Sequence, residues 1–181
     1  MYYYPHYIQF YDSRYSYMHP RYHLSRQRAR TLTIKGNIHI KDYEQFGSDE
    51  ICNLPINLSV PLNNTEYATV FTENLGCGGE CRTEVEIQAK ILQTGEDILV
   101  NMFTRFYEGS SEVTTELEDH KETYNFLVRP NAITPLVHNL ANNDVGGSDI
   151  SIVAVEFQNI SGSSGGEYLG ERDQQDQHHR L

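Results

Sequence analysis

The chain has 181 residues, of which 38% are hydrophobic, with three cysteines and no tryptophan. This length suits one domain with flanking segments. The formal net charge of −11 disfavours nucleic acid as a partner of the main body, because a negative surface repels phosphates. No stretch reaches the roughly 18 apolar residues of a membrane helix, and the N-terminus lacks the apolar core of a secretory signal. We therefore expect a cytoplasmic protein, or an extracellular one that is exported by an unconventional route.

The charge is distributed very unevenly along the chain. Residues 1–30 contain eight tyrosines and five arginines against one acid, whereas residues 31–160 contain seven Lys/Arg and twenty Asp/Glu. Residues 161–181 begin with a Gly/Ser-rich linker and continue as a polar tail. We expect an N-terminal arm that is disordered or ordered by a partner, a folded domain over 31–160, and a disordered tail.

The arm has the composition of segments that associate with themselves. Tyrosine supplies a large contact area at a low cost in conformational entropy, and plain disordered chains usually avoid aromatic residues. A simple disordered terminus is the alternative interpretation. The residues expected to make contacts between subunits are Tyr2, Tyr3, Tyr4, Tyr7, Tyr11, Arg14 and Arg21.

The domain alternates apolar and polar residues with the period of β-strands. Eight strands are expected, over residues 31–40, 52–60, 67–72, 83–92, 98–107, 123–128, 136–140 and 150–160. Pro55 has no amide proton and places the second strand at a sheet edge, whereas 98–107 and 150–160 are apolar enough to be central. The best helix candidate, 113–121, is short. The pattern predicts an all-β fold, an antiparallel β-sandwich of about eight strands, jelly-roll-like or C2-like.

Antiparallel strands that reverse at every loop place alternate loops at the same end. One end then gathers loops 42–51, 73–82, 108–122 and 141–149, with thirteen acids, and the other end gathers three. Carboxylates in flexible loops suit Ca²⁺. The candidate ligands are Asp42, Asp49, Glu50, Glu118, Asp119, Asp144 and Asp149. The alternative is a solvated acidic rim, because the acidic end also has the longer loops.

The same reasoning brings the three cysteines to the acidic end. Cys52 can form a disulfide with Cys77 or Cys81, Cys77 can pair with Cys81 within the loop, or all three can be free thiols. A zinc site of these cysteines with His120 is less favoured, because a single C-x₃-C pair is half of a zinc signature. Between Cys77 and Cys81, Gly78 and Gly79 predict a tight turn with positive φ.

No catalytic motif is recognised: the sequence has no G-x-S-x-G, H-E-x-x-H or P-loop. We therefore expect a non-enzymatic structural, adhesive or self-assembling protein whose arm contacts other copies of the chain. The alternative is a β-sandwich that binds Ca²⁺, a carbohydrate or another protein through its acidic loops. A second alternative is a small domain that is stabilised by zinc or a disulfide and has an unknown role.

Overall fold

The computed structural model describes residues 29–44, 47–93, 95–111, 113–142 and 148–161. The arm residues named above, the C-terminal tail and Asp144 lie outside this range. The described residues form eight β-strands: β1 (Arg30–Asp42), β2 (Glu50–Leu62), β3 (Ala68–Cys77), β4 (Cys81–Ile91), β5 (Ile98–Tyr107), β6 (Leu117–Val128), β7 (Ile133–Ala141) and β8 (Ile150–Ser161). They include no helix, and hence none that could cross a membrane.

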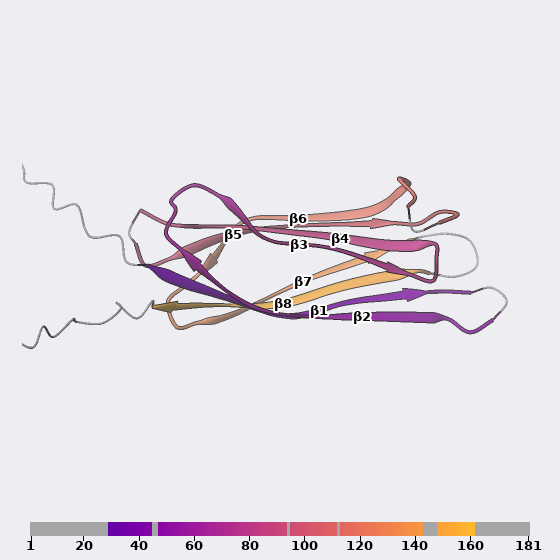
Figure 1. The fold of residues 1–181 in the computed structure, drawn as a ribbon, viewed down its shortest axis with the longest axis horizontal. Helices are drawn as coiled ribbons and strands as arrows, with labels where there is room; N and C mark the ends of the chain where they lie inside the picture. Colours follow the sequence, from indigo (N-terminus) through magenta and orange to yellow (C-terminus); the bar gives the residue numbers. More distant parts are fainter. Residues whose placement is uncertain (1–28, 45–46, 94, 112, 143–147, 162–181) are drawn as a thin grey trace, which may run out of the picture.

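The strands form two stacked four-stranded antiparallel sheets (Figure 1), with the orders β2-β1-β8-β7 and β3-β4-β5-β6. The expected all-β sandwich is confirmed. The strand order is not that of a jelly roll, which is built from Greek keys. Within each sheet, strands that are neighbours in sequence lie side by side, and the one further pair is β1 with β8. The fold is an eight-stranded meander in which the chain crosses from the first sheet to the second after β2 and crosses back after β6. The edge position of β2 and the central positions of β5 and β8 are as predicted.

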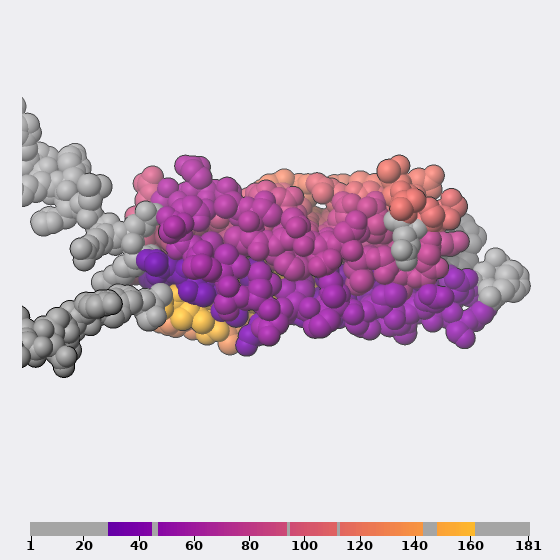
Figure 2. Space-filling view, viewed as in Figure 1, coloured from indigo at the N-terminus to yellow at the C-terminus, as the bar shows by residue number. Residues whose placement is uncertain are grey.

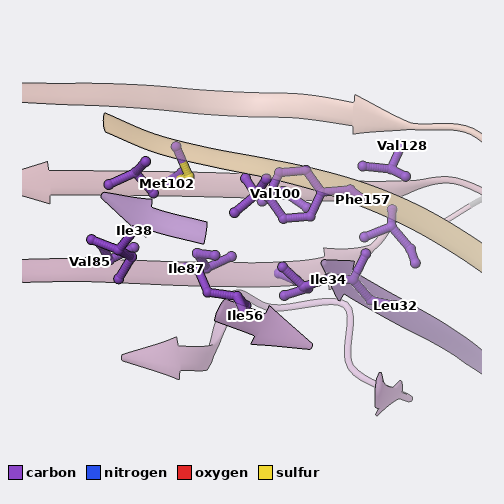
Figure 3. Packing of buried hydrophobic residues seen from close by; sticks show 14 of the residues in the cluster. Leu32, Ile34, Ile38, Ile56, Val85, Ile87, Val100, Met102, Val128 and Phe157 are labelled. Atoms are coloured by element: carbon purple, nitrogen blue, oxygen red, sulfur yellow. The ribbon is translucent and has the colours of Figure 1, made fainter. Parts of the chain in front are cut away.

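One hydrophobic core fills the space between the sheets, as Figure 3 shows. Ile34 and Ile38 of β1 and Phe157 of β8 face Ile87 of β4 and Met102 of β5, and all five side chains are fully buried. Each comes from a strand in which apolar residues occupy alternate positions, and successive side chains of a strand point to opposite faces. The alternation seen in the sequence is thus the inward face of each sheet.

β6 differs most from the sequence prediction. The expected strand covered 123–128, and 113–121 was the best helix candidate, but the structure has strand from Leu117. Residues 117–122 are exposed apart from the half-buried Asp119, so they have no apolar alternation that could reveal a strand. Backbone pairing with β5 holds them in the sheet, so the short helix candidate over 113–121 is strand from Leu117 onward.

The two long sides of the sandwich are closed by different interactions. On the β6–β7 side, the buried His138 of β7 lies between two threonines, with Nδ1 2.7 Å from Thr104 Oγ1 and Nε2 2.8 Å from Thr123 Oγ1. Thr104 donates its own proton to the Lys121 carbonyl, so Nδ1–H donates to Thr104 and Nε2 accepts from Thr123. On the β2–β3 side, a disulfide joins Cys52 to Cys77.

The end at which the described chain begins and finishes is held by two buried polar side chains. Arg30 donates to the Gly95 carbonyl at 3.2 Å and to Ser161 Oγ at 2.8 Å. Asn159 donates to the carbonyls of Glu96 and Val128 at 2.8 and 3.0 Å. Because the partners belong to the other sheet or its loops, except Ser161, these bonds tie the two sheets together at this end.

The His138 contacts predict how stability depends on pH. Burial, and then the charge of Lys121, lowers the pKa of His138. The unfolded chain therefore binds a proton at His138 more readily than the folded chain does. The fold has its full stability above the ordinary histidine pKa of about 6.5, and it loses stability as the pH falls below this value. Between pH 7 and pH 5, urea denaturation should show a larger loss of unfolding free energy for the native chain than for His138→Gln. His120→Gln, at an exposed position of β6, should behave like the native chain, and parallel curves for all three proteins would contradict the assignment.

Candidate functional site

The end of the sandwich away from residues 30 and 161 collects the β1–β2, β3–β4, β5–β6 and β7–β8 connections, as the alternation of loops predicted (Figure 1). Here three functional groups meet in the interior. Asp42 is the last residue of β1, Cys81 is the first of β4, and Asp149 directly precedes β8. One carboxylate oxygen of each aspartate and Cys81 Sγ all lie within 4.8 Å of one another. We call these three residues the acid–thiol cluster.

The cluster is buried, and one of its oxygens lacks a partner. Asp42 is 2% exposed, Cys81 is 0% exposed and Asp149 is 7% exposed. Asp149 Oδ1 accepts a hydrogen bond from the Tyr43 backbone N–H at 2.6 Å. Asp42 Oδ2 is buried and has no hydrogen-bond partner, although buried polar atoms are nearly always satisfied. It lies against the backbone of Gly78, where φ is +68° and an added Cβ would be 1.7 Å from this oxygen.

The surroundings of the cluster are acidic. Burial, followed by the charges of Asp149, Glu44 and Glu80, raises the pKa of Asp42 to about 6, against a smaller lowering by the Cys81 thiol as a hydrogen-bond donor. Burial, followed by Asp42, Asp149 and Glu108, also raises the pKa of the Cys81 thiol well above its ordinary value. Each group thus holds its proton more tightly than it would in water. A thiol in this state forms little thiolate, which disfavours attack on the neighbouring disulfide.

The disulfide lies beside the cluster and limits what the cysteines can do. Of the alternatives left open by the sequence, the structure has the Cys52–Cys77 pairing, with Cys81 as a free, buried thiol. Cys77 and Gly78 are consecutive, so the disulfide also anchors the turn that packs on Asp42. The expected zinc set is not assembled, because two of its sulfurs are bonded to each other and His120 is exposed on β6.

Of the expected calcium ligands, the structure brings together Asp42 and Asp149. Asp49 instead forms an ion pair with Lys41 at 2.7 Å. Asp119 uses Oδ2 to accept a hydrogen bond from the Ala141 backbone N–H, which helps to close the β6–β7 side. The remaining described members, Glu50 and Glu118, are exposed on β2 and β6.

Cys81 was expected in a disulfide, as a free thiol or in a zinc site, and it was not linked to the two aspartates. A signal for the cluster was present in the sequence. Asp42 continues the apolar positions Ile38 and Ile40, Cys81 leads into Thr83 and Val85, and Asp149 leads into Ser151 and Val153. A polar group at the end of an inward-facing alternation is placed between the sheets.

A second feature lies on the outer face of the β3–β4 hairpin. A shallow hollow of about 370 Å³ is lined by Thr72, Glu73, Asn74, Glu84, Val85, Glu86 and Arg105. Three of these seven residues are glutamates and one is an arginine. Glu84 pairs with Arg82 at 2.7 Å, and Glu86 accepts hydrogen bonds from Thr69 and Gln88. The hollow is therefore an acidic surface without a catalytic pairing among the groups just described.

The disulfide predicts a defined loss of stability on reduction. Cys52 and Cys77 are 25 residues apart, and closing a loop of this length in the unfolded chain stabilises the fold by about 3 kcal/mol. A reductant should lower the unfolding free energy of the native chain by about this amount in urea denaturation, and should leave Cys52→Ser unchanged. Thiol titration of the denatured, non-reduced protein should find Cys81 alone. Three free thiols would contradict the pairing.

No protein-family model matches this chain, no curated protein matches it, and no solved structure matches it. A function therefore has to be inferred from the acid–thiol cluster, the two sides of the sandwich and the charge of the arm.

Proposed function

We propose that this chain is a non-enzymatic, self-assembling structural protein in which residues 1–28 of one copy bind along the β2–β3 side of another. The observation that carries the proposal is the incomplete burial of the core on that side. Nine hydrophobic residues pack against the core while remaining partly exposed, and seven of them belong to β2 or β3. They are Cys52, Leu54, Leu58, Val60, Val70, Phe71 and Leu75. We call these seven the β2–β3 seam.

The seam holds most of the core-packing side chains that remain partly exposed. β6 and β7 present other exposed apolar side chains, namely Leu117, Tyr124, Leu127, Ile133 and Val137. On the opposite side only Phe126 of β6 and Leu136 of β7 belong to the partly exposed set, and His138 and Asp119 bond the two strands there. In Figure 2, residues of β2 run along the lower part of the molecule and those of β3 lie above them. Covering apolar side chains removes them from water and favours association by about 25 cal/mol per Å².

The backbone of β2 offers hydrogen bonds to an added strand. β2 pairs with β1 in unbroken register over its whole length, so residues of one parity direct their backbone groups to the free side. Pro55 and Pro61 belong to these odd-numbered residues. A proline is tolerated there because its missing amide proton would not have bonded to β1. Four amides, those of Ile51, Asn53, Asn57 and Ser59, then face an incoming strand, and the prolines discourage indiscriminate edge pairing.

The arm matches this surface in length and charge. An extended chain of 28 residues spans at most about 95 Å, whereas the 13 residues of β2 span about 43 Å. Half of the arm can therefore cover β2 while the rest bridges to the donor copy. Residues 1–28 carry four arginines and one acid, because the fifth arginine, Arg30, is buried in β1. Residues 31–160 carry a net charge of −13. The acidic hollow beside β3 gives those arginines an attractive surface.

Two observations support the absence of catalysis. The free thiol, Cys81, is buried, with a pKa that disfavours its reactive form. His138 is buried, and both of its ring nitrogens are hydrogen-bonded to threonines, so it has no free nitrogen for a substrate. Addition of a strand to a sheet edge, with pockets for its alternate side chains, is instead a common mode of peptide recognition. The tyrosines of the arm are the side chains proposed to fill such pockets. A head-to-tail contact of this kind need not close, and it then builds filaments rather than rings.

Removing residues 1–28 tests this function. We expect the full chain to form oligomers or filaments by light scattering and sedimentation, and the truncated chain to remain monomeric at the same concentration. The change Tyr2, Tyr3, Tyr4 and Tyr7→Ser should have the same effect, because it removes the aromatic contact area. Raising the salt concentration should weaken assembly, since exposed charges are screened within about 10 Å at 0.1 M.

Two matched variants on β2 locate the contact. Leu58→Glu places a charge in the seam, whereas Asn57→Glu places one on the outer face of the same strand, at an exposed position. Leu58→Glu should abolish assembly of the full chain, and Asn57→Glu should retain it, with folding of both verified by thermal denaturation. A full chain that stays monomeric at high concentration contradicts the proposal. The proposal is also contradicted if the arm protects the seam of its own copy from hydrogen exchange while the protein remains monomeric.

A further inference from the structure

The acid–thiol cluster joins both sheets at one point. Asp42 and Asp149 are contributed by the β1 and β8 ends of one sheet, and Cys81 by the β4 end of the other. One carboxylate oxygen of each aspartate and the Cys81 sulfur lie within 4.8 Å of one another. All three residues are buried, and the most exposed of them, Asp149, is 7% exposed. This placement is inside the molecule, so a solvated acidic rim does not describe it.

A separate observation points to an occupant. Asp42 Oδ2 is buried without a hydrogen-bond partner, and the groups that act on Asp42 most strongly through their charge are acids: Asp149, Glu44 and Glu80. The nearest basic side chain along β1, Lys41, is paired with Asp49. Buried charges in proteins are normally paired or coordinate a metal. A cation bound here would supply the partner that Asp42 Oδ2 lacks.

We propose that Asp42, Cys81 and Asp149 form a binding site for a thiophilic divalent cation, zinc above all, that links the ends of β1, β4 and β8. Zinc takes sulfur and carboxylate ligands in a tetrahedral arrangement, with bonds of about 2.3 and 2.0 Å. Such bonds place ligand atoms roughly 3.3–3.6 Å apart, so each pair within the cluster has to close by at most about 1.5 Å. A water molecule takes the fourth position.

Zinc fits the donor set better than calcium does. Calcium needs six to eight oxygen ligands, whereas the most deeply buried residue of the cluster is Cys81. Its thiolate selects zinc and softer metals. Binding replaces the Cys81 proton, which passes to solvent, so the three ligands contribute three negative charges against the two positive charges of the ion. None of the three ligands belongs to the β2–β3 seam, and their response to a metal can be measured separately from arm-mediated assembly.

The test uses the full, disulfide-intact chain after removal of metal with a chelator. Micromolar Zn²⁺ should raise the melting temperature by several degrees, because an ion that binds the native state stabilises it by mass action. Ca²⁺ at the same concentration should leave the melting temperature unchanged. Co²⁺ should give the near-ultraviolet charge-transfer band of a cobalt–thiolate bond, and Cys81 is the one free thiol among the described residues.

Three variants decide the outcome. Cys81→Ser should abolish the cobalt–thiolate band and weaken zinc binding at least tenfold. Asp42→Asn should also lose the response to zinc, while its metal-free form melts at or above the temperature of the native chain because a buried charge has been removed. Asp49→Asn, an acid at the same end but outside the cluster, should respond like the native chain.

The imidazoles of His178 and His179 in the tail also attract zinc but give no thiolate band. The proposal is overturned if the band is absent, if the response to zinc survives in Cys81→Ser, or if Ca²⁺ stabilises the native chain as much as Zn²⁺ does.

Discussion

Reversal of the chain after each strand is the constraint on which the rest of this structure depends. Every pair of hydrogen-bonded strands is antiparallel, so the loops alternate between two ends and the residues that follow odd-numbered strands meet at one of them. Asp42 and Asp149 are 107 residues apart in sequence, yet the pairing of β1 with β8 brings them into one cluster. The disulfide closes at the same end for the same reason, because Cys52 and Cys77 lie where β2 begins and β3 finishes.

How well each strand could be predicted follows from how deeply it is buried. β4 buries every second residue without exception, and β5 has the boundaries that were predicted from its apolar character. β6 and the start of β7 are edge segments with many exposed side chains, so their sequences had no need of apolar alternation and gave no signal of it. Pro55 predicted the edge position of β2, because the effect of its missing amide proton is local. The strand order could not be predicted in this way, because it depends on contacts between residues that are distant in sequence.

The sequence predicted at which end of the molecule the candidate site lies, but it did not predict which residues form the site. Alternation of loops gathered Asp42, Asp149 and the three cysteines, but the choice of partner depends on distances of a few ångströms. Asp49 has the same charge as Asp42 and lies in the next loop, yet its neighbour Lys41 holds it outside the cluster. Gly78 leaves room for the Asp42 carboxylate, which depends on the exact path of the β3–β4 turn. Which side chains become partners is decided by distances of a few ångströms, and the alternation of polar and apolar residues does not give such distances.

The energetics of the acidic end explain how the fold can keep a buried carboxylate without a partner. Raising the pKa of Asp42 from 3.8 to about 6 corresponds to a cost of about 3 kcal/mol at pH 7. The folded state binds this proton more tightly, so the cost is present above about pH 6 and disappears as the pH falls towards 3.8. The adjacent Cys52–Cys77 disulfide stabilises the fold by about 3 kcal/mol, which offsets a cost of this size. Natural chains are rarely near their stability optimum, so a fold can carry an unfavourable group of this size while other interactions keep it stable enough to function. The disulfide joins β2 to β3, whereas Asp42, Cys81 and Asp149 lie at the ends of β1, β4 and β8. Its link to the cluster is the β3–β4 turn, where Gly78 follows Cys77 and packs on the Asp42 carboxylate.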